Sequence, residues 1–262
     1  MQAVEKRKRR GRAVYIAIVL TFLYLPMLMV ALFSFNPSKT AGVMTGFTLE
    51  WYRELFTDKE IAKTLANSLK LAALSVGTAA VIGTAGAVAL ARKRMRLQGM
   101  MEGMAMLPAM VPEVVLGMAF LAAFTFAGLK LGLLTLYIAH TTFCIPYIFV
   151  LVRSRLASID PQLEEAARDL GARPARVFFD ITLPLALPAI VAGMLMAFAM
   201  SLDDVVISYF VTGPGAQTLP LKVYSSLKVG VTPEINALCT LTLGLVLIIV
   251  LIAQRIRGAK SS

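Results

Sequence analysis

Long apolar runs separated by short charged segments dominate the chain from residue 13 onward. About 20 consecutive apolar residues form a helix long enough to cross a bilayer. Six such runs lie at about 13–35, 65–91, 101–126, 132–152, 185–208 and 236–256. The pattern predicts an all-α integral membrane protein with six transmembrane helices, in which residues 1–262 form a single transmembrane domain.

Charge refines this picture, because the basic residues gather at the ends of the apolar runs. A formal net charge of +11 would suit a nucleic-acid partner, but this distribution is the one that encodes membrane topology. Four segments hold 18 of the 26 lysines and arginines, at 1–12, 92–100, 153–184 and 255–262. We therefore predict that these segments and both termini are cytoplasmic, and that the lipid bilayer, not nucleic acid, surrounds the chain.

The first apolar run follows six basic residues and therefore resembles a signal peptide. It continues from Ala13 to Phe35, which is too long for a cleavable signal, and no small-residue cleavage site follows it. We expect it to remain as the first span.

An outer segment at about 36–64 is predicted to contain a short helix. Leu49, Tyr52 and Phe56 recur at helical spacing, and Thr48 is a suitable N-cap. Aromatic residues of this kind anchor helices at the membrane interface. A direct contact with a transported solute is the alternative.

Five prolines fall within the predicted spans: Pro26, Pro108, Pro112, Pro146 and Pro188. Each removes a backbone donor, and such breaks are tolerated in a membrane where neighbouring protein or a water-lined cavity covers them. This number of prolines favours a moving bundle over an inert anchor.

The cytoplasmic loop between the fourth and fifth runs is predicted to form a short helical hairpin. Asp160 followed by Pro161 at the first helical position is a helix start, and Gly171 is a natural stop. A helix of about ten residues is marginal alone in water, so it needs a surface to pack against. A second short helix is expected to begin at Arg173-Pro174.

The composition of this first short helix favours close approach by a polar partner. Ala166 and Ala167 have small side chains, and charged residues surround them, namely Glu164, Glu165, Arg168 and Asp169. An ordinary cytoplasmic hairpin is the alternative explanation.

The residue order at the hairpin resembles the EAA motif of ATP-binding-cassette importer permeases. Glu165-Ala166-Ala167 is followed at the motif's spacing by Gly171, Ile181 and Leu183-Pro184. The resemblance implies a type I importer permease fold and a coupling segment at 158–184 that inserts into a groove of a separate ATPase. The residues it assigns to that coupling are Glu164, Glu165, Ala166, Ala167, Asp169 and Gly171.

The chain does not carry the motifs of an ATPase or of a metal enzyme. It has no Gly-Lys dipeptide, and therefore no phosphate-binding P-loop. With one histidine, His140, and no Cys/His cluster, we expect no catalytic residues and no metal site. His140 is most simply a packed residue of the fourth span that hydrogen-bonds a neighbour. ATP and Mg would be bound by the partner ATPase.

Three acids fall within the apolar runs, where charge is expensive and commonly functional. Glu113 follows Pro108 and Pro112 in the third run, and Asp203 and Asp204 lie near the outer end of the fifth. Carboxylates without basic residues in the same runs suit a cationic solute. The alternative for Asp203 and Asp204 is a cap or ion pair at a helix end.

Further segments resemble the spermidine/putrescine permeases over nearly the whole chain, most closely the second permease of those systems. They are residues 47–52, 142–144, 201–206, 210–214 and 229–237. This resemblance implies a homologous second permease, two ATPases, a periplasmic polyamine-binding protein and an inner-membrane location. It also implies substrate-pathway roles for Trp51, Glu113, Asp203 and Asp204, although the family pattern has aspartate where this chain has Glu113.

The function expected from the sequence is therefore transport of putrescine, spermidine or both, by half of a translocation pathway. One alternative is an importer permease for another solute, such as a metal ion, a sugar or an oxyanion. Another is an ATP-independent carrier or channel, which would leave the hairpin motif unexplained. An intramembrane enzyme is the weakest alternative, since no paired nucleophile and base stand out.

Overall fold

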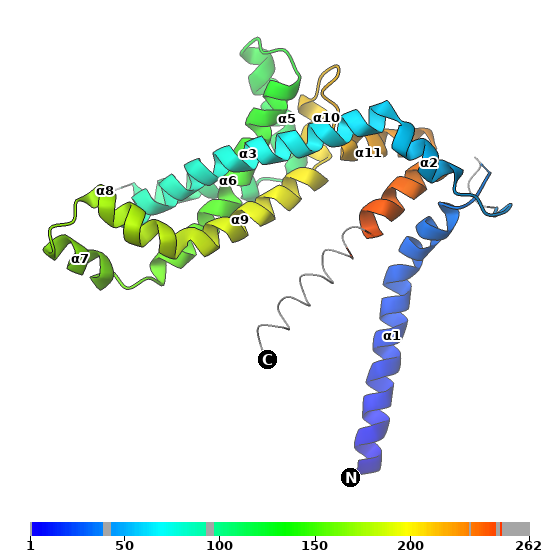
Figure 1. Ribbon diagram of the computed structural model, residues 1–262, viewed down its shortest axis with the longest axis horizontal. Helices are drawn as coiled ribbons and strands as arrows, with labels where there is room; N and C mark the ends of the chain where they lie inside the picture. Colours follow the sequence, from blue (N-terminus) through cyan, green and yellow to red (C-terminus); the bar gives the residue numbers. More distant parts are fainter. Residues whose placement is uncertain (1, 39–42, 93–96, 231, 245–246, 248–262) are drawn as a thin grey trace. The chain divides into compact units, whose positions relative to one another are not determined.

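The structure, a computed structural model, describes residues 2–38, 43–92, 97–230, 232–244 and 247. The chain divides into two compact units (Figure 1), one of residues 1–62 and 223–262 and the other of residues 63–222. We call them unit 1 and unit 2 and describe each by itself.

Unit 1 contains the first apolar run as the long helix α1 (Gln2–Phe33), followed by α2 (Glu50–Thr57). Helix α11 (Leu219–Val229) lies mostly in this unit, and residues 233–244 form a further helix. The apolar residues of α1 from 12 to 28 are exposed along its whole circumference, which a lipid environment accommodates.

Three helices run side by side in unit 2: α3 (Lys59–Arg92), α6 (Leu133–Ala157) and α9 (Leu183–Asp203) (Figure 1). Glycines allow this close packing. A Cβ on Gly193 of α9 would lie 2.9 Å from the Cα of Ile148, and one on Gly83 of α3 would lie 3.2 Å from the carbonyl oxygen of Ile145. Small residues at helix contacts are typical of membrane bundles.

The third apolar run is not the single helix predicted at 101–126. It forms α4 (Gln98–Met110) and α5 (Glu113–Phe126), bent by 105° at the break between them. Pro112 cannot donate to the carbonyl group of Pro108, and it also disfavours a helical conformation at Val111, which is extended at φ −81° and ψ 135°. Pro112 therefore ends one helix and precedes the start of the next.

The fifth run also ends earlier than the predicted 185–208. Helix α9 stops at Asp203, Asp204 is extended, and a new short helix, α10 (Val206–Val211), follows. Helix α10 packs against α5, and the ring of Phe210 covers Gly117 so closely that an added Cβ would lie 2.5 Å from Cδ2.

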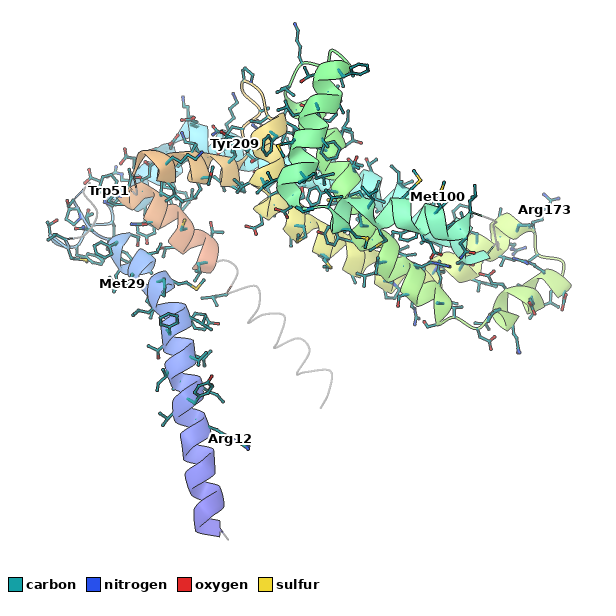
Figure 2. All side chains as sticks on the ribbon, turned by 180° about the vertical axis from the view of Figure 1, so that it is seen from behind. Arg12, Met29, Trp51, Met100, Arg173 and Tyr209 are labelled. Atoms are coloured by element: carbon teal, nitrogen blue, oxygen red, sulfur yellow. The ribbon has the colours of Figure 1, made fainter. Side chains whose placement is uncertain are left out.

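A hairpin of short helices lies at one end of unit 2 (Figure 1). It consists of α7 (Gln162–Asp169), α8 (Pro174–Val177) and a single π-helical turn, η1 (Phe178–Thr182), which continues directly into α9. Figure 2 shows Arg173 in this hairpin, well away from Tyr209 on α10. The second short helix expected after Arg173 is confirmed.

Among the described residues, four helices are long and apolar enough to span a membrane, and the bent pair α4–α5 could supply a fifth. An all-α membrane fold is thus confirmed. The last predicted span, 236–256, is described only as far as residue 244 and at residue 247. The basic cluster at 93–96 lies outside the described residues. The count of six, the orientation of the termini and the single domain remain predictions.

Candidate functional site

Local interactions fix both ends of α7. The Oδ1 atom of Asp160 accepts the N–H of Gln162 at 3.0 Å, so this carboxylate binds the start of the helix. The helix begins at Gln162, with Pro161 and not Asp160 at the N-cap position, and it spans eight residues. Gly171 has φ +85°, the left-handed conformation that glycine adopts freely. The N–H of Ala172 donates to the Ala167 carbonyl at 3.0 Å and closes the helix end.

The acidic residues of α7 have different surroundings. Glu164 is half-buried: its Oε1 accepts the Thr182 hydroxyl at 2.6 Å, and Arg168 lies 3.5 Å from its Oε2. Glu165 and Asp169 are exposed, as is Ala166. Glu164 therefore ties α7 to η1, while the other predicted coupling residues on this helix remain accessible.

A shallow cavity of about 310 Å³ lies between α7 and the following helices. It is lined by Ala167, Leu170, Gly171, Ala172, Arg176, Val177, Asp180 and Ile181. Leu170 is 90% exposed beside it.

In unit 1, α2 turns Trp51 and Leu55 inward and leaves Leu49 and Phe56 exposed. Trp51 is 7% exposed, and its indole N–H donates to the Asn36 carbonyl at 2.7 Å. Helix α2 begins after Leu49, with Thr48 accepting the N–H of Glu50 at 3.2 Å. The exposed residues fit an interfacial helix, whereas Trp51 is packed within its own unit.

Glu113 is the first residue of α5, at the bend after Pro112. This residue is exposed. The bend thus leaves an exposed carboxylate at the start of α5.

The two neighbouring aspartates differ sharply. Asp203, the last residue of α9, is exposed and makes no hydrogen bond or ion pair with the residues that the structure describes. Asp204 is 8% exposed and accepts the N–H groups of Ile207 and Ser208 at 3.1 and 2.8 Å. Asp204 therefore caps α10, which is the alternative role considered for this pair from sequence.

Two charged or polar groupings could not be assigned from sequence. Glu102 of α4 pairs with Arg153 of α6 at 2.6 Å and joins these helices. His140 is buried, as predicted, but its partners, Ser201 and Ser208, lie 61 and 68 positions away. The only features of the sequence that pointed to the His140 grouping were a lone histidine in one apolar run and a pair of acids in another.

The fold and sequence place this chain among importer permeases. Residues 79–260 match the family model of the binding-protein-dependent transport system inner membrane component, and the chain belongs to this family. It is therefore a multi-pass inner-membrane transport subunit of a binding-protein-dependent system, not an enzyme, and has no ATPase domain of its own.

Two of the proteins similar to this chain are permeases of polyamine transport systems. The putrescine transport system permease protein PotI of Escherichia coli (strain K12) is 46% identical over 249 residues, covering 92% of this chain and 89% of the relative. The spermidine/putrescine transport system permease protein PotC of the same strain is 40% identical over 250 residues, covering 95% of each. The family resemblance stated from sequence is confirmed.

Solved structures support the fold. A bacterial ABC transporter chain involved in alginate import aligns with a TM-score of 0.76 over 96% of both chains, at 18% identity. A chain of the MetNI methionine ABC transporter aligns with a TM-score of 0.63 over 78% of this chain and 99% of that chain, at 20% identity. At these identities the similarity shows the importer-permease fold alone.

Proposed function

We propose that this chain is the permease subunit of an ATP-driven importer for putrescine, spermidine or both. The observation that carries the proposal is 46% identity to a putrescine permease over 92% of the chain. The cargo is a small organic cation, and the chain forms half of its path through the inner membrane. The resulting topology has six spans with both termini in the cytoplasm.

The hairpin at 158–184 couples this chain to one of two ATPase subunits, which bind ATP and Mg. Its accessible Glu165, Ala166 and Asp169 and its exposed Leu170 support this role, because they form a charged surface with small and apolar contacts. Glu164 contributes from within by holding α7 against η1. Gly171 contributes by ending the helix.

The cargo path lies between this chain and a homologous second permease, which together receive the polyamine from a periplasmic binding protein. Glu113 and Asp203 are exposed on unit 2, so their carboxylates can accept the ammonium groups of a diamine or triamine. Asp204 contributes to this path by capping α10. Trp51 contributes by packing within unit 1.

Uptake of labelled putrescine and spermidine by cells that lack other polyamine carriers tests the function. Glu113→Gln combined with Asp203→Asn should lower uptake at subsaturating putrescine at least about tenfold, because charge-assisted hydrogen bonds to the cargo are lost. Glu54→Gln, which neutralises an exposed acid of α2, is the matched control and should leave uptake unchanged.

Two outcomes would contradict the proposal. If the wild-type protein takes up another solute but no polyamine, the proposed cargo is wrong. If the double variant takes up putrescine normally, the proposed role of the two acids is wrong. Co-purification of a stoichiometric ATPase separates an importer from an ATP-independent carrier or channel.

A further inference from the structure

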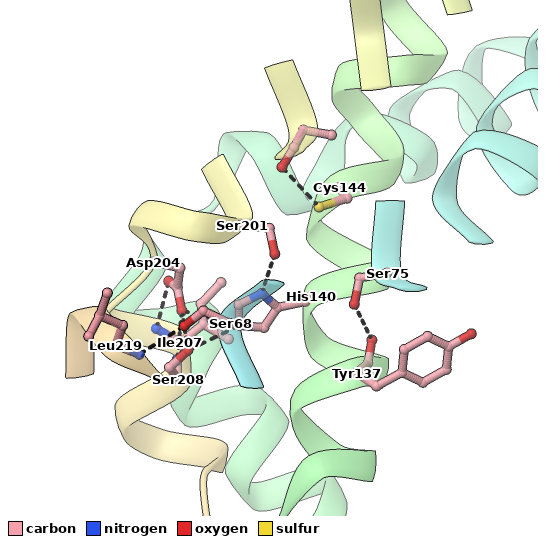
Figure 3. Close-up of polar contacts among 11 residues, drawn as sticks. Ser68, Ser75, Tyr137, His140, Cys144, Ser201, Asp204, Ile207, Ser208 and Leu219 are labelled. Atoms are coloured by element: carbon pink, nitrogen blue, oxygen red, sulfur yellow. Dashed lines mark hydrogen bonds and ion pairs between the residues drawn. The ribbon is translucent and has the colours of Figure 1, made fainter. Parts of the chain in front are cut away.

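A buried polar cluster joins three helices of unit 2 (Figure 3). His140 comes from α6, Ser201 and Asp204 from α9 and its end, and Ser208 from α10. His140 is 0% exposed, and both serines are buried. Burying polar groups in an apolar bundle is costly unless they hydrogen-bond to one another. A cluster in which each polar group has such a partner therefore indicates an arrangement with a role in the protein.

The hydrogen bonds determine which ring nitrogen of a neutral His140 carries the proton. The Ser208 hydroxyl donates its single hydrogen to Asp204 Oδ2 at 2.8 Å, so it must accept from His140 Nε2 at 3.0 Å. The Nε2–H group also lies 3.4 Å from Asp204 Oδ2. Nδ1 then accepts the Ser201 hydroxyl at 2.8 Å. Every polar group of the cluster has a partner in this assignment.

The cluster is connected to both exposed acids. Asp203 precedes Asp204 directly, so the anchored Asp204 carboxylate determines where the end of α9 presents Asp203. Asp204 also caps α10, which packs on α5 through Phe210 and Gly117. Helix α5 begins at Glu113. Asp204 is therefore connected to Glu113 through the contact between α10 and α5.

We propose that His140 is a positioning residue for transport, which holds Asp204 as an internal anchor so that Asp203 and Glu113 are presented together to a cationic cargo. This role rests on the proposed function. Asp204 acts through the fold and does not contact the cargo, because its carboxylate already accepts three hydrogen bonds and lies 3.4 Å from His140 Nε2.

Three substitutions at one position separate positioning from simple packing. The amide nitrogen of glutamine in His140→Gln reaches the place of Nε2 and keeps the donor to Ser208 and Asp204. The amide in His140→Asn reaches only the place of Nδ1 and keeps the contact with Ser201. His140→Phe keeps the ring volume and removes both polar contacts. Only the glutamine variant should preserve the anchor.

The first measurement is the KM and maximal rate of putrescine uptake in proteoliposomes that contain the whole transporter, normalised to co-purified ATPase. We expect His140→Phe and His140→Asn to raise KM about tenfold, as loss of a hydrogen bond to a charged group does. His140→Gln should stay within about twofold of wild type. Thr141→Val is the matched control, since the buried Thr141 hydroxyl has no partner within the described part of the chain.

An unchanged KM in His140→Phe, or equal KM values in the glutamine and asparagine variants, would overturn the proposal. If His140→Phe fails to assemble, Ser208→Ala removes the hydroxyl that links His140 to Asp204 and should raise KM in the same way. A normal KM in Ser208→Ala would likewise overturn it.

A second measurement does not depend on the cargo. Spin labels on cysteines placed at positions 113 and 203, with Cys144 and Cys239 replaced by alanine, report the separation of the two acid positions. We expect a broader distance distribution in His140→Phe than in Thr141→Val, and identical distributions would overturn the proposal. Absence of wild-type polyamine uptake would refute the proposed function while this measurement still decides the positioning role.

Discussion

The hairpin at 158–184 and the His140 cluster use the same kinds of residue in opposite ways. In the hairpin, Glu165 and Asp169 face solvent beside Leu170, and only Glu164 is engaged within the fold. In the cluster, Asp204 and His140 are buried and bonded on every side. One region has its polar groups available for another molecule, and the other has used them to hold helices together.

This difference shows that the depth of an acid in the fold predicts its role better than its sequence neighbourhood does. Asp203 and Asp204 are adjacent, yet one is exposed and the other caps a helix from inside the bundle. Substitutions in the cluster should therefore reduce stability, whereas those in the hairpin should reduce assembly with little change in stability.

The largest effect is expected at the centre of the cluster. Asp204→Ala removes the cap of α10 and leaves the Ser208 hydroxyl and the Ile207 and Ser208 N–H groups without an acceptor, which should lower the free energy of unfolding by about 3 kcal/mol. Thermal denaturation of the purified permease in detergent measures this, with Asp203→Ala as the neighbouring control. Equal melting temperatures for the two variants would contradict the contrast between these aspartates.

A somewhat smaller effect, on assembly and not on stability, is expected in the hairpin. Ala166→Trp places a large ring where a partner must approach the backbone, and should weaken ATPase association by about 2 kcal/mol, or roughly 30-fold. The measurement is ATPase co-purification at several salt concentrations. Ala175→Trp, at an exposed alanine of α8, is the control, and retention of the ATPase by Ala166→Trp would argue against docking on this face.

A still smaller effect is expected where α7 ends. Gly171 has φ +85° and no neighbour that an added Cβ would meet, so Gly171→Ala isolates the cost of the left-handed backbone, about 1 kcal/mol. Hydrogen exchange of the α7 amides should accelerate several-fold while the amides of α6 remain protected. Unaltered exchange in α7 would mean that the helix end is held by something other than Gly171.

The smallest effect is expected at the exposed ion pair of Arg176 and Asp180, which are 3.1 Å apart. Asp180→Asn should change the unfolding free energy by less than about 0.5 kcal/mol, since solvent screens such pairs. Chemical denaturation provides the comparison with Glu164→Gln, whose bond to Thr182 is half-buried and should contribute more. A larger loss in Asp180→Asn than in Glu164→Gln would reverse the expected order.

Local features were predictable from sequence because their causes are local. The Asp160 carboxylate at the start of α7 and the Gly171 stop each depend on residues a few positions apart, and the structure contains both. Prolines 108 and 112 indicated a disturbed helix but not a bend of 105°, because the direction after a break depends on what the second helix packs against. The contact of α5 with α10 is of that kind.

The candidate site was harder to predict than the fold. Sequence placed Glu113, Asp203 and Asp204 in one group as buried acids, but their surroundings depend on contacts between distant segments. The role of Asp204 becomes visible only when His140 and Ser208 are brought beside it. Similarly, the packed position of Trp51 depends on the carbonyl group of Asn36, which no spacing rule connects to it.

The π-helical turn η1 has a consequence for insertions and deletions. In this turn, the N–H of Leu183 donates to the carbonyl of Phe178, five residues earlier, so the turn holds one residue more than an α-helix would need. Deleting one residue between 178 and 182 would restore α-helical hydrogen bonding with little rotation of the preceding segment relative to α9, because the π turn already accommodates the extra residue. The same deletion inside α9 would rotate everything before it by about 100°. This turn is therefore the place where the connection between the hairpin and α9 best tolerates the loss of one residue.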